Sequence, residues 1–142
     1  MKTAIVYYSY KGTTKRYCKA LTENIGADLY EIKAAKEQGM FLCLLTQCPM
    51  AIRQKTTKIK TKPIDLTGYD KILIASPMWA GYPAPVFNNI VEMLPSGKEV
   101  EIIVVSGSGT TKPAVKEKVT NLVNKTGSVV VGYRDVLNTT VV

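Results

Sequence analysis

The chain has 142 residues, of which 46% are apolar and 21% charged, which fits a single globular domain. No segment approaches the roughly 18 uncharged apolar residues of a membrane-spanning helix, and no secretory signal is apparent. The absence of histidine excludes Ser-His and Cys-His hydrolytic chemistry, and with no histidine the three cysteines give no trusted metal-site spacing. Because these cysteines are few and odd in number, we expect a reducing, cytoplasmic environment.

The first elements predict an anion-binding site. A short apolar run predicts a strand over about 2–8, and apolar residues spaced three or four apart predict a helix over about 13–25. The loop between them is rich in hydroxyls and contains a glycine. Because the first turn of a helix has unpaired N–H groups, such a loop can hold a phosphate. An ordinary turn with a helix cap uses the same residue types, so both interpretations stay open.

The rest of the chain continues the alternation of strands and helices. A helix is expected over 40–54, and Pro49 makes this helix uncertain or bent. Pro77 is expected to end the strand over 71–76. The expected strands are 28–32, 71–76, 100–106 and 128–133, and the expected helices are 40–54, 85–94 and a segment that begins at Pro113.

Three of the strands end in small polar loops, after Tyr8, after Ser76 and after Ser106. Alternating strands and helices form a parallel sheet with right-handed crossovers, so these three ends lie at the same edge. Ligands of open α/β sheets bind at that edge. The convergence of three loops is a stronger signal than any one of them.

These residues resemble the flavodoxin family over nearly the whole chain. The first loop looks like that family's FMN phosphate loop, the second is similar to the short-flavodoxin pattern Pro-x-Trp-x-Gly-x-x-x-Pro, and the third looks like its small-residue loop at the pyrimidine end of the flavin. The resemblance implies an α/β fold, a doubly wound five-stranded parallel sheet in the order 2-1-3-4-5, as a single domain over residues 1–142. The implied FMN-binding residues are Ser9, Tyr10, Lys11, Gly12, Thr13, Thr14, Ser76, Pro77, Met78, Trp79, Ala80, Gly81, Ser106, Gly107, Ser108 and Gly109.

The resemblance also implies a role for each loop. Ser9, Thr13 and Thr14 would donate to the phosphate. Trp79, the only tryptophan, would stack on the flavin ring, although a core-capping aromatic is the alternative. Gly81 matches the family's flexible glycine, whose peptide turns over when the flavin is reduced, or it is a plain turn glycine. No catalytic residue is implied.

Three features depart from the family pattern. Lys11 stands where threonine is usual. The formal charge of +8, from 19 basic and 11 acidic residues, favours acidic partner proteins, whereas flavodoxins are generally acidic. The final helix of the family is missing after Tyr133, which predicts a bare sheet face that a second copy of the chain could cover as a homodimer, unless the chain is a fragment or an altered fold.

The sequence thus favours an FMN protein that shuttles electrons between cytoplasmic redox partners, and no separate substrate is evident. Two alternatives remain open. One is a binding or regulatory module that has lost FMN, and the other is a small FMN-dependent reductase of quinones or metal ions. The basic run from Arg53 to Lys62 has no interleaved aromatic side chains, so a nucleic-acid partner is not expected.

Overall fold

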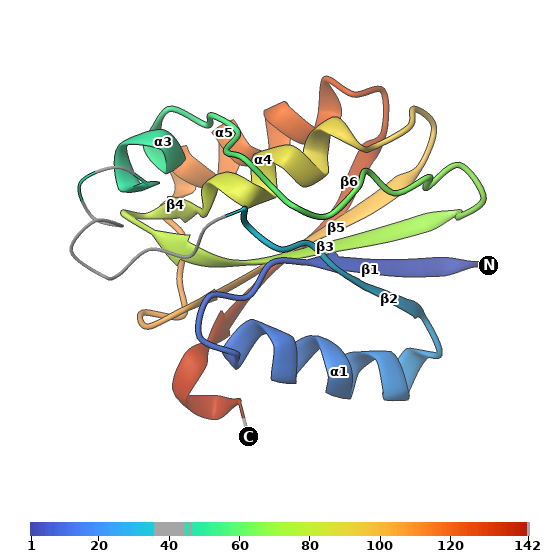
Figure 1. The fold of residues 1–142 in the computed structure, drawn as a ribbon, viewed down its shortest axis with the longest axis horizontal. Coiled ribbons are helices and arrows are strands. Elements are labelled where there is room, and N and C mark those ends of the chain that lie inside the picture. Colours follow the sequence, from blue (N-terminus) through green and yellow to red (C-terminus); the bar gives the residue numbers. More distant parts are fainter. Residues whose placement is uncertain (36–44, 46, 142) are drawn as a thin grey trace.

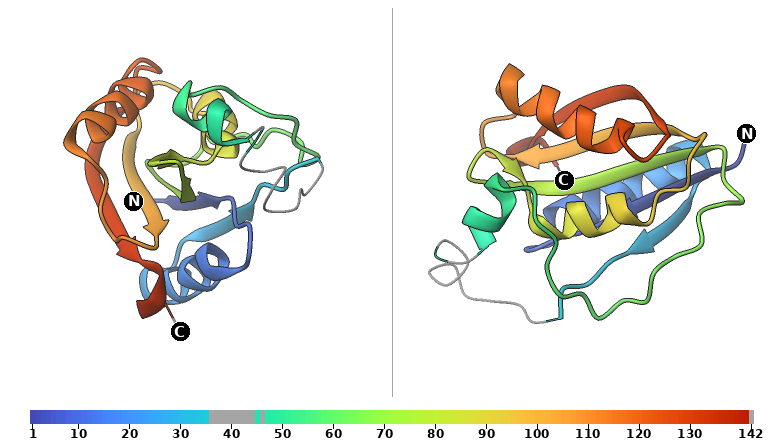
Figure 2. Two further views of the ribbon diagram at one scale, coloured as in Figure 1. Left: turned by 90° about the vertical axis from the view of Figure 1, so that its left-hand side faces the viewer. Right: turned by 90° about the horizontal axis from the view of Figure 1, so that it is seen from above.

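The computed structural model describes residues 1–35, 45 and 47–141. A central sheet separates two layers: α1 lies on one side, and α4 and α5 lie on the other, with α3 beside them (Figure 1). The end-on view shows the same separation (Figure 2). The strands are β1 (Thr3–Tyr7), β2 (Asp28–Glu31), β3 (Lys71–Trp79), β4 (Tyr82–Pro83), β5 (Glu99–Ser106) and β6 (Val129–Leu137). The helices are α1 (Thr13–Ile25), α3 (Cys48–Ile52), α4 (Pro85–Glu92), α5 (Pro113–Asn124) and a final 3-10 turn, η2 (Asn138–Thr140).

The order of the long strands is β2-β1-β3-β5-β6, and all neighbours in it are parallel. This is the doubly wound order expected from the resemblance. The expectation of five strands was incomplete, because the two-residue β4 pairs antiparallel with the end of β3. That extra strand turns the second predicted loop into a hairpin.

Pro77 does not end its strand, contrary to the prediction. β3 continues through Pro77 to Trp79, and Pro77 is in register with Val105 of β5. The Pro77 carbonyl accepts from the Ala84 amide at 3.0 Å, on the side where β1 has already ended. In a parallel pair the N–H and C=O of one residue face the same neighbour, so the missing N–H costs no bond to β5.

The start of the helix predicted over 40–54 lies mostly outside the described residues, which omit 36–44 and 46. The described residues Leu45 and Gln47 are π-helical, and α3 follows directly from Cys48 to Ile52. The helix therefore ends two residues before its predicted end at Gln54. Pro49 lies in the first turn of α3, directly after the helical residue Gln47.

β6 extends four residues beyond its predicted end at Tyr133 and stops at Leu137. Arg134 and Asp135 lie in this extension, and both side chains are paired. The Arg134 guanidinium donates to Glu101 Oε1 at 2.8 Å and to the Tyr17 hydroxyl at 2.7 Å. Asp135 accepts from Thr111. Because alternate side chains of the strand find partners on opposite faces, the strand can carry charges to its end.

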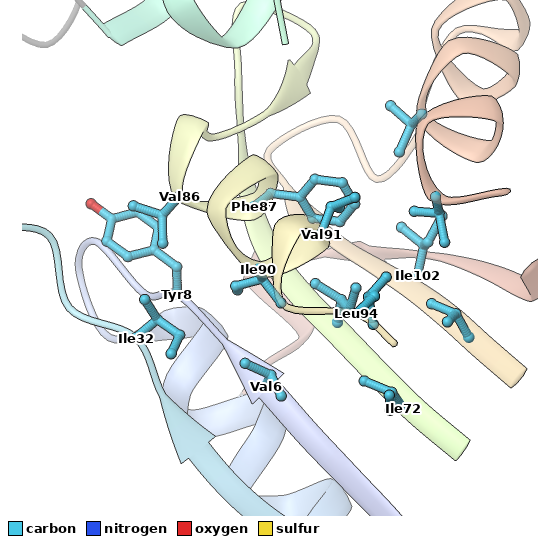
Figure 3. Packing of buried hydrophobic residues seen from close by; sticks show 14 of the residues in the cluster. Val6, Tyr8, Ile32, Ile72, Val86, Phe87, Ile90, Val91, Leu94 and Ile102 are labelled. Atoms are coloured by element: carbon cyan, nitrogen blue, oxygen red, sulfur yellow. The ribbon is translucent and has the colours of Figure 1, made fainter. Parts of the chain in front are cut away.

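The larger core lies between the sheet and helices α4 and α5. Figure 3 shows side chains of α4, including Phe87 and Ile90, packed over Val6 and Ile72 of the central strands. These four residues are fully buried. The apolar stripe predicted for this helix is the face that packs on the sheet, which fixes α4 directly behind the β3–β4 hairpin.

On the α1 side, ion pairs cover part of the sheet. Glu101 of β5 lies 3.5 Å from the Lys71 ammonium and 2.8 Å from the Arg134 guanidinium. The chain then turns back toward α1 (Figures 1 and 2), and Val141 packs against the smaller core cluster there. These ion pairs cover part of the sheet near α1, while Val129 and Val131 of β6 remain exposed. The bare sheet face and the homodimer stay predictions. None of the described helices has the length and apolar character that crossing a membrane requires.

Candidate functional site

A cavity of about 190 Å³ lies at the edge of the sheet where the parallel strands end. All three predicted loops contribute to it. Its lining combines hydroxyl groups with the apolar surfaces of Met78 and Trp79. The volume is below the roughly 300–1,000 Å³ of a closed ligand pocket, so a larger ligand would lie partly in the open mouth. The lining residues are Ser9, Tyr10, Lys11, Thr13, Thr14, Pro77, Met78, Trp79, Val105, Ser106, Gly107 and Asn138.

The first loop is folded around Ser9. Its Oγ accepts from the amides of Gly12 at 3.0 Å and Lys15 at 3.2 Å. Gly12 has a φ of 95°, which turns the chain sharply into α1. The amides of Thr13 and Thr14 lie in the first helical turn and have no acceptor among the contacts of the described residues. The loop therefore offers N–H groups, hydroxyls and the positive end of a helix dipole to an anion.

The second loop is a tight hairpin that places Trp79. Trp79 pairs in register with Tyr82, and Ala80 and Gly81 form the two-residue turn between them. Their φ values are 53° and 85°, as in a turn that matches the twist of a hairpin. Such a φ is free for glycine but strained for alanine, by about 1–2 kcal/mol. A strained residue thus lies directly beside the cavity wall.

Trp79 is held between two tyrosines from the first strand and loop. Its ring meets Tyr10 edge-on at 5.3 Å between centroids and Tyr8 edge-on at 6.0 Å. Edge-to-face contacts of this kind fix the orientation of a ring. Because Tyr8 is buried and Trp79 is half-buried, part of the indole stays available at the cavity.

The third loop is anchored from two directions. Ser106 Oγ accepts from the Gly109 amide at 2.9 Å and closes the turn. Thr111 donates twice to the Asp135 carboxylate, from its hydroxyl at 2.6 Å and from its amide at 3.2 Å. The Tyr133 hydroxyl donates to Thr111 Oγ1 at 3.0 Å, and burial raises the pKa of Tyr133 to about 12. Two side chains of β6 therefore hold the end of the loop.

Ten of the sixteen predicted FMN-binding residues line the cavity, and the others support it from behind or lie beside it. Buried Ser76 accepts from the Ala84 amide at 3.1 Å and donates to the Pro77 carbonyl at 2.8 Å, which fastens the base of the hairpin. Predicted residues outside the cavity lining are Gly12, Ser76, Ala80, Gly81, Ser108 and Gly109.

Two lining residues were missed by the sequence analysis, Val105 and Asn138. Val105 is the last apolar residue of β5 and looked like core. Asn138 follows β6 directly and reaches the cavity because β6 is longer than predicted. The parallel topology was the available signal, because it also brings the end of the last strand to this edge. Within the described part of the chain, no cluster of acidic, cysteine or histidine side chains could hold a metal ion.

Comparison with known proteins assigns the chain to a family. The sequence profile described as Flavodoxin matches residues 2–141. A flavoprotein from Lactobacillus acidophilus, crystallised in complex with FMN, is 28% identical with a TM-score of 0.79, over 94% of this chain and 93% of that one. The apo form of the flavoprotein from the same organism matches with a TM-score of 0.67 at 28% identity, over 94% and 91%.

A more distant structure shares the fold. Two-electron reduced flavodoxin from Megasphaera elsdenii is 20% identical, with a TM-score of 0.59 over 96% of this chain and 86% of that one. A search of curated protein sequences gave no match. The profile match covers almost the whole chain, and the structural matches agree with it. The chain belongs to the flavodoxin family.

Proposed function

We propose that this chain binds FMN at the three-loop cavity and carries electrons between cytoplasmic redox partner proteins. The observation that carries the proposal is the pairing, in one cavity, of a hydroxyl- and amide-rich helix N-terminus with an orientated indole ring. The first suits a phosphate and the second suits a flat aromatic ring. The FMN bound to the Lactobacillus acidophilus flavoprotein, a structure that matches along nearly the whole chain, supports the same ligand.

The residues present fit FMN in both its charged and its apolar parts. Ser9, Thr13 and Thr14 surround the phosphate position, and Lys11 adds a positive charge to it. Met78 and Trp79, on the second loop, form an apolar wall of the same cavity. The small cavity volume agrees with a ligand whose ring edge stays exposed to a partner.

FMN supplies the redox chemistry when bound, because it accepts and releases one or two electrons. The chain binds the phosphate, orients the ring and shields part of it from water. Among the described residues at the cavity we assign no acid, base or nucleophile to a separate reaction. An electron carrier therefore explains the site without a substrate pocket of its own.

The proposal is tested by adding FMN to flavin-free protein. Binding should quench FMN fluorescence, with one equivalent bound, and the complex should show flavin absorbance bands that bleach on reduction and return on oxidation by an added acceptor. A protein that takes up no FMN would instead favour the module without a cofactor. Light scattering of the FMN-loaded sample at micromolar concentration would separate a monomer from the expected homodimer.

Trp79→Ala tests the ring wall directly. We expect FMN to bind at least fivefold more weakly and its reduction potential to change, because the loss of an aromatic contact costs about 1 kcal/mol or more. Trp79→Phe keeps a flat ring and should recover most of the affinity. Unchanged affinity and potential in Trp79→Ala would remove Trp79 from the site.

A further inference from the structure

The described charges are unevenly distributed along the strand direction. At the edge where the strands begin, opposite the cavity, exposed carboxylates stand at or next to the ends of elements. Asp28 begins β2, Glu99 begins β5, Asp70 directly precedes β3, and Glu92 ends α4. Lys2, Lys71, Lys98 and Lys125 lie at the same edge, so the charges there are mixed.

At the edge with the cavity, exposed cations outnumber exposed carboxylates. We name Lys11, Arg16, Lys112 and Lys118 the cationic rim. Lys11 lines the cavity, and the Arg16 guanidinium lies 3.4 Å from Thr13 Oγ1. The Lys118 ammonium lies 3.3 Å from the Tyr82 hydroxyl, and Lys112 is the residue before α5. Within the described chain, no carboxylate lies within 4 Å of these four charges.

Acidic residues near this edge are fewer than the cations. Glu31 is paired with Lys15 at 3.6 Å, and Asp135 accepts from Thr111. Glu117 is exposed on α5, between Lys116 and Lys118. The N-termini of α1 and α5 add the positive ends of two helix dipoles to the same edge. The local field at the cavity mouth is thus positive.

A bound phosphate accounts for only half of the rim. Lys11 and Arg16 flank the loop where the phosphate would lie. Lys118 packs against the β3–β4 hairpin, with its ammonium 6.0 Å from the centre of the Tyr82 ring, and Lys112 follows the third loop. These two therefore lie near the second and third loops, where the flavin ring would lie. A bound phosphate therefore does not explain why Lys112 and Lys118 also lie near the cavity.

We propose that the cationic rim docks the acidic face of a partner redox protein, with electrons leaving through the exposed flavin edge that the rim surrounds. The inference rests on the proposed function, because it needs bound FMN. Complementary charge around a small exposed edge speeds encounter, by about 10–1,000-fold at low ionic strength, without a large buried interface. A protein partner fits better than a nucleic acid, because the cations encircle a cavity rather than follow a groove.

The test uses FMN-loaded, fully reduced protein in stopped-flow mixing with two oxidants of opposite charge. The probes are oxidised plastocyanin, an acidic copper protein, and oxidised cytochrome c, a basic haem protein. Lys118→Glu and Lys125→Glu are the matched variants, because both residues are exposed. Lys118 lies on α5 near the cavity, and Lys125 caps the far end of the same helix. The two variants have the same net charge.

We expect the rate with plastocyanin to fall as salt rises, and to fall about fivefold in Lys118→Glu but little in Lys125→Glu at low salt. Cytochrome c should respond in the opposite direction. Equal rates for the two variants at unchanged FMN affinity would overturn the docking role of the cationic rim but not the binding of FMN. A chain that binds no FMN would overturn both proposals. Steeply salt-dependent retention on DNA that Lys118→Glu abolishes would assign the rim to nucleic acid and overturn the protein partner.

Discussion

Substitution of Thr14 tests whether its hydroxyl binds the phosphate or supports the fold. It lines the cavity from the first turn of α1 and is 2% exposed. Thr14→Ala should weaken FMN about tenfold or more, because a hydrogen bond to a charged group contributes about 1.5–3 kcal/mol. Riboflavin, which has no phosphate, should bind as before. Fluorescence titration with both ligands gives the comparison.

Thr14→Ser is the matched control for this prediction. It keeps the hydroxyl and removes one methyl group, so FMN affinity should return toward that of the parent chain. An equal loss of FMN and riboflavin in Thr14→Ala would mean that Thr14 supports the loop rather than the phosphate.

At single positions the sequence predicted which kinds of side chain lie near the cavity better than it predicted whether each one faces the cavity. The hydroxyls of the first loop were predicted because their type and order match an anion site, and Ser9, Thr13 and Thr14 line the cavity. Ser76 was assigned to the ligand with them, but its side chain is buried and fastens the hairpin. A serine at the end of a buried strand has both options, and only the position of the Ala84 amide decides between them.

The β3–β4 hairpin is the element that determines where Trp79 lies. A Cβ at Gly81 would meet no atom within 4 Å, yet its φ of 85° strains any other residue. Gly81→Ala should therefore cost about 1 kcal/mol of unfolding free energy through the backbone alone, and weaken FMN by moving the tryptophan. Urea unfolding and FMN titration measure the two effects.

Gly26 offers a control because its backbone also has a positive φ. It caps α1 with a φ of 68°, and its added Cβ would also meet nothing within 4 Å. Gly26→Ala should lose a similar amount of stability and leave FMN affinity unchanged. If both variants bind FMN like the parent chain, the hairpin does not position the tryptophan.

The contact between β6 and the third loop is a second coupling between elements. Asp135 accepts both donors of Thr111, at the end of that loop. Asp135→Asn keeps the shape but loses the charge and one acceptor, so we expect faster amide hydrogen exchange over residues 107–111 and several-fold weaker FMN binding. Exchange that stays slow, with weaker FMN binding, would instead mean that the Asp135 charge acts on FMN directly.

The lengths of elements were harder to predict than their existence. The sequence identified β1, α1 and β5 close to their bounds and α5 at its start. Pro77 was expected to end its strand, but β3 continues and pairs with β4. The last strand was expected to end at Tyr133, but it continues, and Asp135 in the extension has a partner in Thr111. Such partners are distant in sequence, so a local pattern contains no information about them.

For the whole molecule, alternation of strands and helices was sufficient to place three loops at one edge. It could not show how charge is arranged, because a net value of +8 does not locate any residue. Topology decides which residues share an edge: Asp28, Lys71 and Glu99 begin strands, whereas Lys11 and Lys112 precede helices. Strand starts and helix starts lie at opposite edges in this fold.

The unfolding free energy of the chain should decrease at alkaline pH, because buried groups hold their protons more tightly in the folded chain than in the unfolded chain. Burial raises the pKa of the Cys18 thiol from 9.0 to about 12. The unfolded chain releases this proton first, so the contribution is fully present below pH 9 and is lost as pH rises toward 12. Tyr133, raised from 10.0 to about 12, acts in the same direction at higher pH.

Cys18→Ala isolates this effect from the other titrating groups. The variant should be less stable at pH 8, because it leaves a small cavity where a fully buried side chain packed against the sheet. Between pH 9 and 10 the parent chain should lose about 1 kcal/mol more than the variant, since one proton contributes about 1.4 kcal/mol per pH unit. Urea unfolding at both pH values measures the difference, and lysine titration cancels because both proteins share it. Stability curves that stay parallel across this range would show that Cys18 releases its proton equally in the folded and unfolded chain.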